Sequence, residues 1–110
     1  QKRQQDEIEK RESMFRQVLE IDPEDTLANY GLGEIEYLKE NYAKSIAHLQ
    51  TAISSQKNYS VAWLQLAKSF IALRREEEAK ATLQEGIAIA GKNGDLMPAN
   101  EMQRLLSELK

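Results

Sequence analysis

The sequence resembles itself when it is shifted by 34 residues, and this internal repeat constrains the fold more than any other feature. Identical residues stand at this offset in the pairs Ala28 and Ala62, Leu32 and Leu66, Ala47 and Ala81, Leu49 and Leu83, Gln50 and Gln84, and Ile53 and Ile87. A period of this length is typical of helical repeats, in which each unit buries its apolar face only against its neighbours. The chain is therefore predicted to be one all-α domain.

Turn residues separate the apolar stretches and mark the expected ends of the helices. Apolar residues at helical spacing predict helices over 4–21, 23–40, 42–54, 60–73 and 75–90, followed by a sixth helix at the C-terminus. Asp22 is expected to cap the second helix, with Pro23 in its first turn. Asn41 and Asp95 are the expected caps of the third and sixth helices. The stretch 91–94 contains two glycines and is the strongest break in the chain.

Composition excludes several classes of function. The formal net charge is -3, so no strongly basic surface is expected to bind nucleic acid. No run of about 18 apolar residues is present, so no membrane span is expected. The chain has no Cys, which excludes disulfides and thiolate metal sites. We expect a cytoplasmic protein, and the absence of an initiator Met suggests an excised domain.

The pattern Trp63-x-x-Leu66-Ala67-x-x-Phe70, followed by Ala79-x-x-x-Leu83-x-x-Gly86, resembles the tetratricopeptide repeat, and a weaker copy stands one period earlier. The resemblance implies a right-handed α-α superhelix of about six helices with a C-terminal capping helix. It divides the chain into a leading half repeat (1–23), two repeats (24–59 and 60–93) and a capping helix (94–110). The C-terminal piece is similar to the end of small free-standing bacterial proteins of this family.

Several positions depart from the family pattern. Asn29 and Glu36 stand where the family prefers large aromatic residues, and Arg11 stands where it prefers Ala. The junction between the first two helices is therefore expected to be looser and wetter than the next one. The turns at Glu40 and Arg74 lack the usual glycine.

The resemblance implies a protein–protein interaction adaptor that presents a concave groove to a peptide or a helix. The face that should line this groove is unusually apolar and comprises Leu27, Tyr30, Glu34, Tyr37, Leu38, Val61, Leu64, Lys68, Ile71 and Ala72. Tyr30 and Tyr37 are the expected anchors, and Glu34 and Lys68 are expected to set the orientation of the partner. Family members that grip a chaperone's C-terminal carboxylate use Lys, Arg and Asn on this face. Here the corresponding residues are Leu27, Tyr30, Gly31, Glu34, Val61, Gln65 and Lys68, so that clamp is expected to be absent.

Three alternatives remain open at the level of sequence. The sixth helix or the N-terminal helix could fold across the apolar face and bury it. The chain could instead form a homodimer through the N-terminal half repeat, where Ile8 and Phe15 are expected to be partly uncovered. An enzyme is the remote alternative, because His48 is a lone histidine without a supporting acid pair at ligand spacing. No cofactor or metal is expected.

Overall fold

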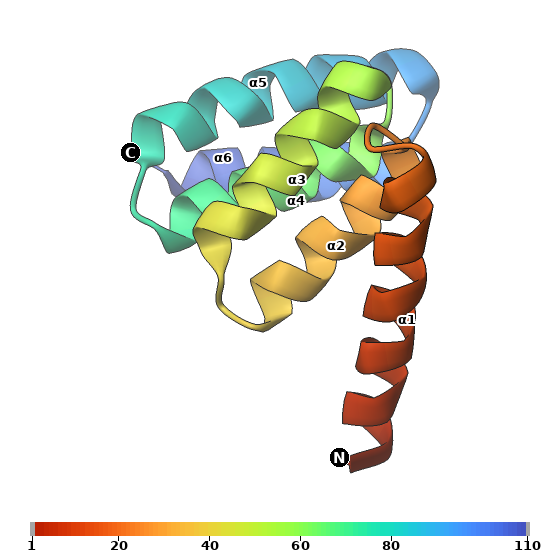
Figure 1. The fold of residues 1–110 in the computed structure, drawn as a ribbon. Coiled ribbons are helices and arrows are strands. Elements are labelled where there is room, and N and C mark those ends of the chain that lie inside the picture. The colour runs from red at the N-terminus through yellow and green to blue at the C-terminus, as the bar shows by residue number, and fades with distance from the viewer. Residues whose placement is uncertain (1, 110) are drawn as a thin grey trace.

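The computed structural model describes residues 2–109, and it contains six helices joined by short turns (Figure 1). The helices are α1 (Lys2–Ile21), α2 (Thr26–Leu38), α3 (Tyr42–Ser55), α4 (Ser60–Ala72), α5 (Glu76–Asn93) and α6 (Leu96–Glu108). No strand occurs within residues 2–109. The prediction of an all-α chain is confirmed.

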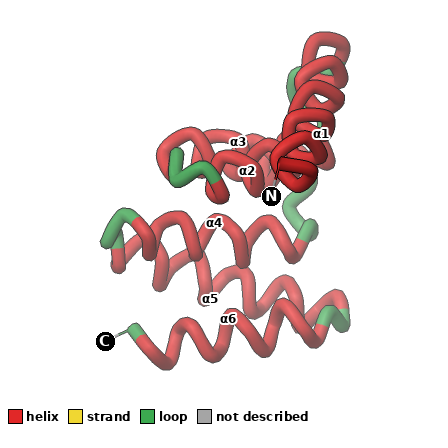
Figure 2. Tube along the Cα trace, turned by 90° about the horizontal axis from the view of Figure 1, so that it is seen from below, coloured by secondary structure: helices red, strands yellow, loops and turns green. Residues whose placement is uncertain are grey.

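The helices stack as a right-handed superhelix in which each helix packs against the next one along the chain (Figure 2). Helix α4 also contacts α2 on one side and α6 on the other. Helices α2, α4 and α6 therefore form a continuous inner layer, and α1, α3 and α5 lie outside it. This layer carries the candidate site.

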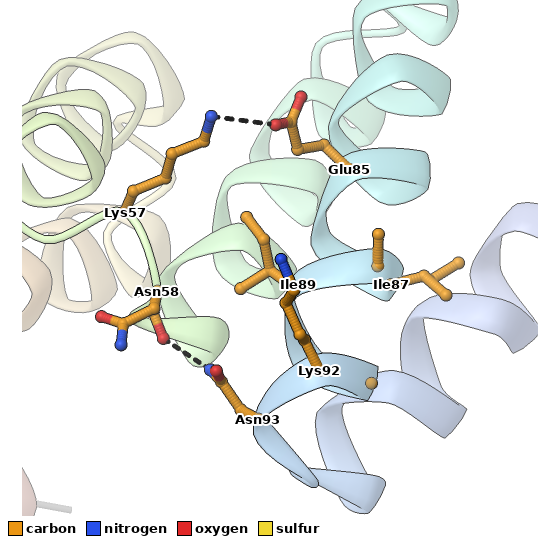
Figure 3. Close-up of a pocket in the computed structure, with 9 residues that line it drawn as sticks. Lys57, Asn58, Glu85, Ile87, Ile89, Lys92 and Asn93 are labelled. Atoms are coloured by element: carbon orange, nitrogen blue, oxygen red, sulfur yellow. Dashed lines mark hydrogen bonds and ion pairs between the residues drawn. The ribbon is translucent and has the colours of Figure 1, made fainter.

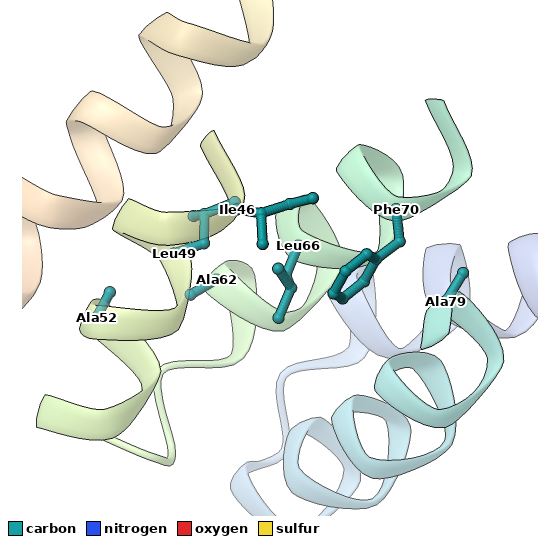
Figure 4. Close-up of a cluster of buried hydrophobic side chains, with 7 residues drawn as sticks. All are labelled: Ile46, Leu49, Ala52, Ala62, Leu66, Phe70 and Ala79. Atoms are coloured by element: carbon teal, nitrogen blue, oxygen red, sulfur yellow. The ribbon is translucent and has the colours of Figure 1, made fainter. Parts of the chain in front are cut away.

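Small residues allow the helices of the stack to approach closely. One apolar cluster joins α3, α4 and α5 and consists of Ile46, Leu49, Ala52, Ala62, Leu66, Phe70 and Ala79 (Figure 4). A Cβ atom added to Gly33 would lie 2.6 Å from the Leu49 side chain, and one added to Gly86 would lie 2.6 Å from the sulfur of Met102. A Cβ atom at either position would therefore force its neighbour to move.

The start of α2 differs from the prediction. Asp25, rather than Asp22, caps the helix, because its carboxylate accepts a hydrogen bond from the backbone N–H of Ala28 at 2.9 Å. Asp22 instead accepts from the backbone N–H of Glu24 at 3.2 Å. Pro23 therefore lies in a turn before the helix and not in its first turn.

Asn41 and Asp95 precede α3 and α6, but neither side chain caps the helix that follows. The side-chain amide of Asn41 donates to Glu36 at 2.9 Å. The carboxylate of Asp95 accepts from the hydroxyl of Ser60 at 2.6 Å. Both side chains thus tie neighbouring helices together, so the two predictions of side-chain capping are wrong.

Helix α5 runs one turn further than predicted. Gly91 lies inside the helix, and Gly94 ends it with φ +76°, which is the left-handed conformation that glycine adopts readily. The side chain of Asn93 holds the additional turn by donating to the carbonyl of Asn58 at 2.8 Å and to the hydroxyl of Ser60 at 2.9 Å.

Three helices end in the same hydrogen-bonded turn, known as the Schellman motif. At the end of α2, the N–H of Asn41 donates to the carbonyl of Glu36 at 2.8 Å, and the N–H of Glu40 donates to that of Tyr37 at 2.9 Å. Equivalent bonds close α4 and α5. The motif requires positive φ, which is +64° at Glu40 and +60° at Arg74.

The polar residues at the junction between α1 and α2 have partners within the chain. Asn29 is 2% exposed, and its amide nitrogen donates to the carbonyls of Pro23 and Asp25 at 3.0 Å each. Its amide oxygen lies 3.0 Å from Nδ1 of His48 on α3. Both ends of the amide therefore have hydrogen-bond partners within the chain.

Glu36 is also buried at this junction, and it is paired. Its carboxylate is 3.3 Å from the guanidinium of Arg16 on α1. The ring of Phe15 fills the space next to Gly31, so Phe15 is buried and only Ile8 of the predicted uncovered pair is half exposed. Helices α1 and α2 are the least extensively packed pair of successive helices, which agrees with the prediction of a looser junction, although residues on α1 and α3 supply partners for its buried polar groups.

Candidate functional site

The structure places the predicted groove residues together on the inner layer, and their exposed face is the candidate groove. They lie on α2 and α4 at the spacing of one helix face. Leu27, Leu38 and Val61 are 58%, 63% and 37% exposed, which is high for large apolar side chains. The other predicted residues are half-buried, namely Tyr30, Glu34, Tyr37, Leu64, Lys68 and Ile71. These exposed apolar side chains face solvent in the free protein.

Tyr30 is held firmly near the start of α2. Its hydroxyl donates to the carboxylate of Glu34 at 3.0 Å, and its ring makes an edge contact with Tyr59 at 5.4 Å. Burial and the negative charge of Glu34 raise the pKa of Tyr30 above its ordinary value. The phenol therefore stays protonated and is a fixed hydrogen-bond donor. Arg11 approaches the same carboxylate at 3.8 Å.

Tyr37 is held in a similar way near the end of α2. Its ring meets that of Tyr42 at 5.4 Å in an edge contact. The ammonium group of Lys68 lies 5.9 Å from the centre of the Tyr37 ring, within range of a cation–π attraction. Both predicted anchor tyrosines therefore have neighbours that favour one side-chain position, which would reduce the entropy lost on binding.

Helix α6 forms one wall of the groove and leaves it open. It packs against α5 and α4, and within residues 2–109 it makes no contact with α2. Between α4 and α6 lies a pocket of about 620 Å³ lined by Val61, Leu64, Lys68, Met97, Pro98, Asn100, Glu101 and Arg104. The alternative in which the sixth helix folds across α2 is therefore not observed.

The sequence reasoning missed the contribution of α6 to this groove. Met97 is 83% exposed and lies beside Val61. On the same wall, the guanidinium group of Arg104 forms an ion pair with the carboxylate of Glu101 at 2.6 Å. The apolar stripe of α6 that the sequence displays packs into the core through Met102. Met97 lies outside that stripe, so the sequence pattern could have indicated that its side chain faces solvent.

Gln65 is another residue whose role the sequence did not reveal. It is 9% exposed on α4, and its Nε2 is buried without a hydrogen-bond partner among residues 2–109. Buried side-chain amides are nearly always paired, so this donor requires an explanation.

A second pocket of about 700 Å³ lies on the outer side of the stack, between the α3–α4 turn and α5 (Figure 3). An ion pair between Lys57 and Glu85 spans it at 3.3 Å, and Asn93 donates to the Asn58 carbonyl at its edge. The pocket is larger than the one in the groove. Three of its polar side chains, those of Lys57, Glu85 and Asn93, already have partners within the chain.

His48 shows no arrangement for catalysis. Its Nδ1 lies 3.0 Å from the amide oxygen of Asn29, where it acts as a donor, since the Asn29 nitrogen already serves two carbonyls. Burial and the charge of Arg16 lower the pKa of His48. Within residues 2–109, no three His, Cys, Asp or Glu side chains gather at a possible metal site. No helix in this range has the length and apolar character of a membrane span.

Comparisons with known proteins agree with this architecture. A family model described as a tetratricopeptide repeat matches residues 36–97. No curated protein matches the chain at a significant level. A solved structure of protein BPP2914 from Bordetella parapertussis is 26% identical, with a TM-score of 0.77 over 89% of this chain and 85% of that one. A tetratricopeptide repeat domain protein from Salinibacter ruber is 24% identical, with a TM-score of 0.72 over 80% of this chain and 89% of that one.

A further solved structure contains a bound partner. The TPR2B domain of yeast Sti1, in complex with pHsp70, has a TM-score of 0.85 and is 17% identical, over 94% of this chain and 83% of that one. At this level of identity the likeness concerns the fold.

Proposed function

Because the chain belongs to the tetratricopeptide repeat family, we propose that it is an interaction adaptor that binds a peptide or a helix of another protein in the groove formed by α2, α4 and α6. The exposed apolar area in the groove supports this proposal most directly. Leu27, Leu38, Val61 and Met97 are each between 37% and 83% exposed on one inner layer. An apolar surface with polar groups at its edge is typical of a binding site.

The two predicted anchor tyrosines favour the same function. Tyr30 and Tyr37 each hold an edge contact with a second tyrosine, and each lies next to a charged group, Glu34 or Lys68. Fixed aromatic rings supply contact area at a low cost in entropy. The neighbouring charges would orient the partner.

The residues on this face do not favour a partner that is held by its C-terminal carboxylate. Val61 stands at a place where carboxylate-gripping members of the family carry a basic or amide side chain that holds the peptide's C-terminus. An apolar valine cannot hold a carboxylate. We therefore propose a partner recognised through apolar side chains.

The test uses peptides recovered from a phage-displayed library of random 12-residue sequences, with binding measured by titration calorimetry. Val61→Glu and Leu38→Glu place charges on the apolar groove at exposed positions, and we expect each to weaken binding at least tenfold, because a charge must then be desolvated. The matched controls are Ala47→Glu and Ala81→Glu, which are exposed on the outer helices. Equal binding by the groove variants and the wild type would refute the groove assignment.

Self-association is a second candidate. Met14 and Ile21 on α1 are 53% and 89% exposed, which leaves apolar area at the N-terminal end of the stack. A second chain could cover it and form a homodimer. Light scattering across a hundredfold range of concentration tests this candidate, and a constant mass of one chain would exclude it.

We also propose that the protein has no catalytic activity and that it is located in the cytoplasm. His48, the sole histidine, is half-buried and hydrogen-bonded to Asn29, so it is poorly placed to act as a base. A hydrolase and transferase screen in which wild type and His48→Ala are equally inactive would support this part. Cell fractionation tests the location.

A further inference from the structure

The outer pocket of about 700 Å³, between the α3–α4 turn and α5, has an apolar wall that the fold does not require. Its residues Ala88 and Ile89 stand one period after Ser54 and Ser55 on α3. The equivalent place at the end of α3 is a smaller pocket of about 390 Å³ with a mostly polar lining, namely Glu24, Ala47, Gln50, Thr51, Ser54 and Ser55. Polar residues are therefore sufficient for the fold at this position, so the apolar wall of the outer pocket indicates contact with another molecule.

The outer pocket also carries an unpaired positive charge. Glu85, Ile89 and Lys92 lie at helical spacing, so they share one face of α5. Glu85 pairs with Lys57 across the pocket at 3.3 Å, whereas Lys92 is exposed and has no hydrogen bond or ion pair with any residue in the range 2–109 (Figure 3). A Cβ atom added to Gly91 would contact nothing within 4 Å, so this side of the pocket is open. The pocket thus presents an apolar side chain beside a free ammonium group.

A matching surface of opposite charge lies at the α1–α2 turn. Ile21 stands two periods before Ile89, and it is 89% exposed, the highest fraction of any large apolar side chain in residues 2–109. Glu20 and Glu24 are exposed near it, and neither carboxylate has a partner in the described part of the chain. Glu24 stands two periods before Lys92, so equivalent positions carry opposite charges. We refer to Glu20, Ile21, Asp22 and Glu24 as the acidic tip.

The acidic tip and the outer pocket lie on the same edge of the stack, but they do not meet within one chain. The α1–α2, α3–α4 and α5–α6 turns lie together at this edge (Figure 1). Helix α1 packs only against α2, and it makes no contact with α5 in residues 2–109. A second copy of the chain can therefore bring what the pocket would recognise, which is an exposed apolar side chain flanked by carboxylates.

We propose that two copies of the chain form a dimer edge to edge, with the acidic tip of each copy in the outer pocket of the other. Ile21 would pack against Ile89, and the carboxylate of Glu24 would pair with the ammonium group of Lys92. The two contacts are related by a two-fold axis, so the assembly closes at two chains. The apolar contact would supply affinity, and the charge pairs would set the register of the two copies.

This inference rests on the self-association candidate and gives it a defined second surface. The outer pocket is formed by α5 and the α3–α4 turn, whereas the groove is formed by α2, α4 and α6. The contact therefore uses none of the predicted groove residues. Peptide binding in the groove should be equally strong in the monomer and in the dimer.

The test measures the dissociation constant of the dimer by sedimentation equilibrium at low salt. The wild type should reach the mass of two 12.6 kDa chains at high concentration. Lys92→Glu and Glu24→Lys each place like charges opposite one another at both contacts, and each should weaken the dimer about tenfold or more. The matched controls are Lys44→Glu on α3 and Glu7→Lys on α1, which make the same changes of charge at exposed positions outside the contact. Both controls should dimerise as the wild type does.

An equal mixture of Lys92→Glu and Glu24→Lys should restore the dimer. In the mixed dimer each acidic or reversed tip meets a pocket of opposite charge, whereas each variant alone repels a copy of itself. Added NaCl screens surface charges, so it should weaken the wild-type dimer and strengthen the Lys92→Glu dimer.

A separate variant tests the apolar part of the contact. Ile89→Ser introduces the residue that the equivalent position of α3 carries, so the helix should still form, and circular dichroism checks this. The variant should weaken the dimer about tenfold or more, because the apolar contact is lost twice.

The two proposals fail in different ways. A constant mass of one chain at every concentration would refute both the contact and the self-association candidate, without affecting the groove proposal. A dimer that responds to neither Lys92→Glu nor Glu24→Lys would refute the contact and leave self-association through another surface, such as the one at Met14. A mixture of the two variants that stays monomeric where the wild type dimerises would overturn the inference, as would masses that rise beyond two chains.

Discussion

Replacing Glu40 and Arg74 by glycine should stabilise the protein. Both residues are exposed, and both hold positive φ, +64° and +60°, in turns that end α2 and α4. The left-handed conformation costs a residue with a Cβ atom about 1–2 kcal/mol. Glycine avoids this cost but loses about 0.5–1 kcal/mol more conformational entropy on folding. The expected net gain is therefore about 0.5–1 kcal/mol for each substitution.

The double variant should gain about 1–2 kcal/mol, because the two residues lie in separate turns. An unfolding entropy of about 2.1 cal/mol/K per residue over 110 residues converts this gain into a rise in Tm of about 4–9 °C. Differential scanning calorimetry measures the midpoint, and urea unfolding measures the free energy.

Alanine variants separate the backbone effect from the loss of a side chain. Glu40→Ala and Arg74→Ala remove the charged groups but keep a Cβ atom, so they should show no such gain. Gly94→Ala introduces the same strain at the end of α5, where an added Cβ would contact nothing within 4 Å, and should destabilise by about 0.5–1 kcal/mol. Glycine variants no more stable than the alanine variants would refute the reasoning.

Three further predictions concern the core and pH. Trp63→Ala should lower the free energy of unfolding by about 3–5 kcal/mol, because the residue is buried and its Nε1 donates to the Lys57 carbonyl at 2.8 Å. Chemical denaturation measures this loss, and a loss under about 1 kcal/mol would contradict the packing. Gly91→Ala should stabilise the protein by about 1 kcal/mol, since its Cβ atom would point into open space. Gly31→Ala should destabilise it by about 1–3 kcal/mol, since its Cβ atom would lie 2.2 Å from the Phe15 ring. A calorimetric change of the same sign for both variants would contradict this difference. Burial lowers the pKa of His48, so the unfolded chain binds the proton more tightly than the folded protein does. The stability of the wild type relative to His48→Gln should therefore fall as the pH drops below about 6.5. Urea unfolding free energies that change in parallel for both proteins between pH 8 and 5 would exclude the effect.

The internal period predicted the helices well because apolar spacing is a local property. The first turn of α2 was harder to predict, since Asp22 and Asp25 are both acceptable caps and the turn at Pro23 decides between them. The polar pair Asn29 and Glu36 was expected to loosen a junction. Their partners come from other helices, and a sequence pattern does not display such pairing.

The groove was predictable in outline and not in its details. Offset by one period, Leu27 and Val61 occupy equivalent positions, so the apolar face could be read from the repeat. The wall at Met97 depends on the angle at which α6 packs, and the unpaired amide of Gln65 depends on what surrounds it in three dimensions. Neither property is encoded in spacing alone.

Each helix of this stack packs against the helix that follows it in the chain, and the added contacts of α4 reach only one helix further on either side. The fold therefore has no long-range closure that fixes its length. A duplicated copy of residues 60–93, inserted after residue 93, would meet the same neighbours as the original and could fold without rearranging the rest. The protein is in this sense extensible, and a lengthened version would present a proportionally longer groove.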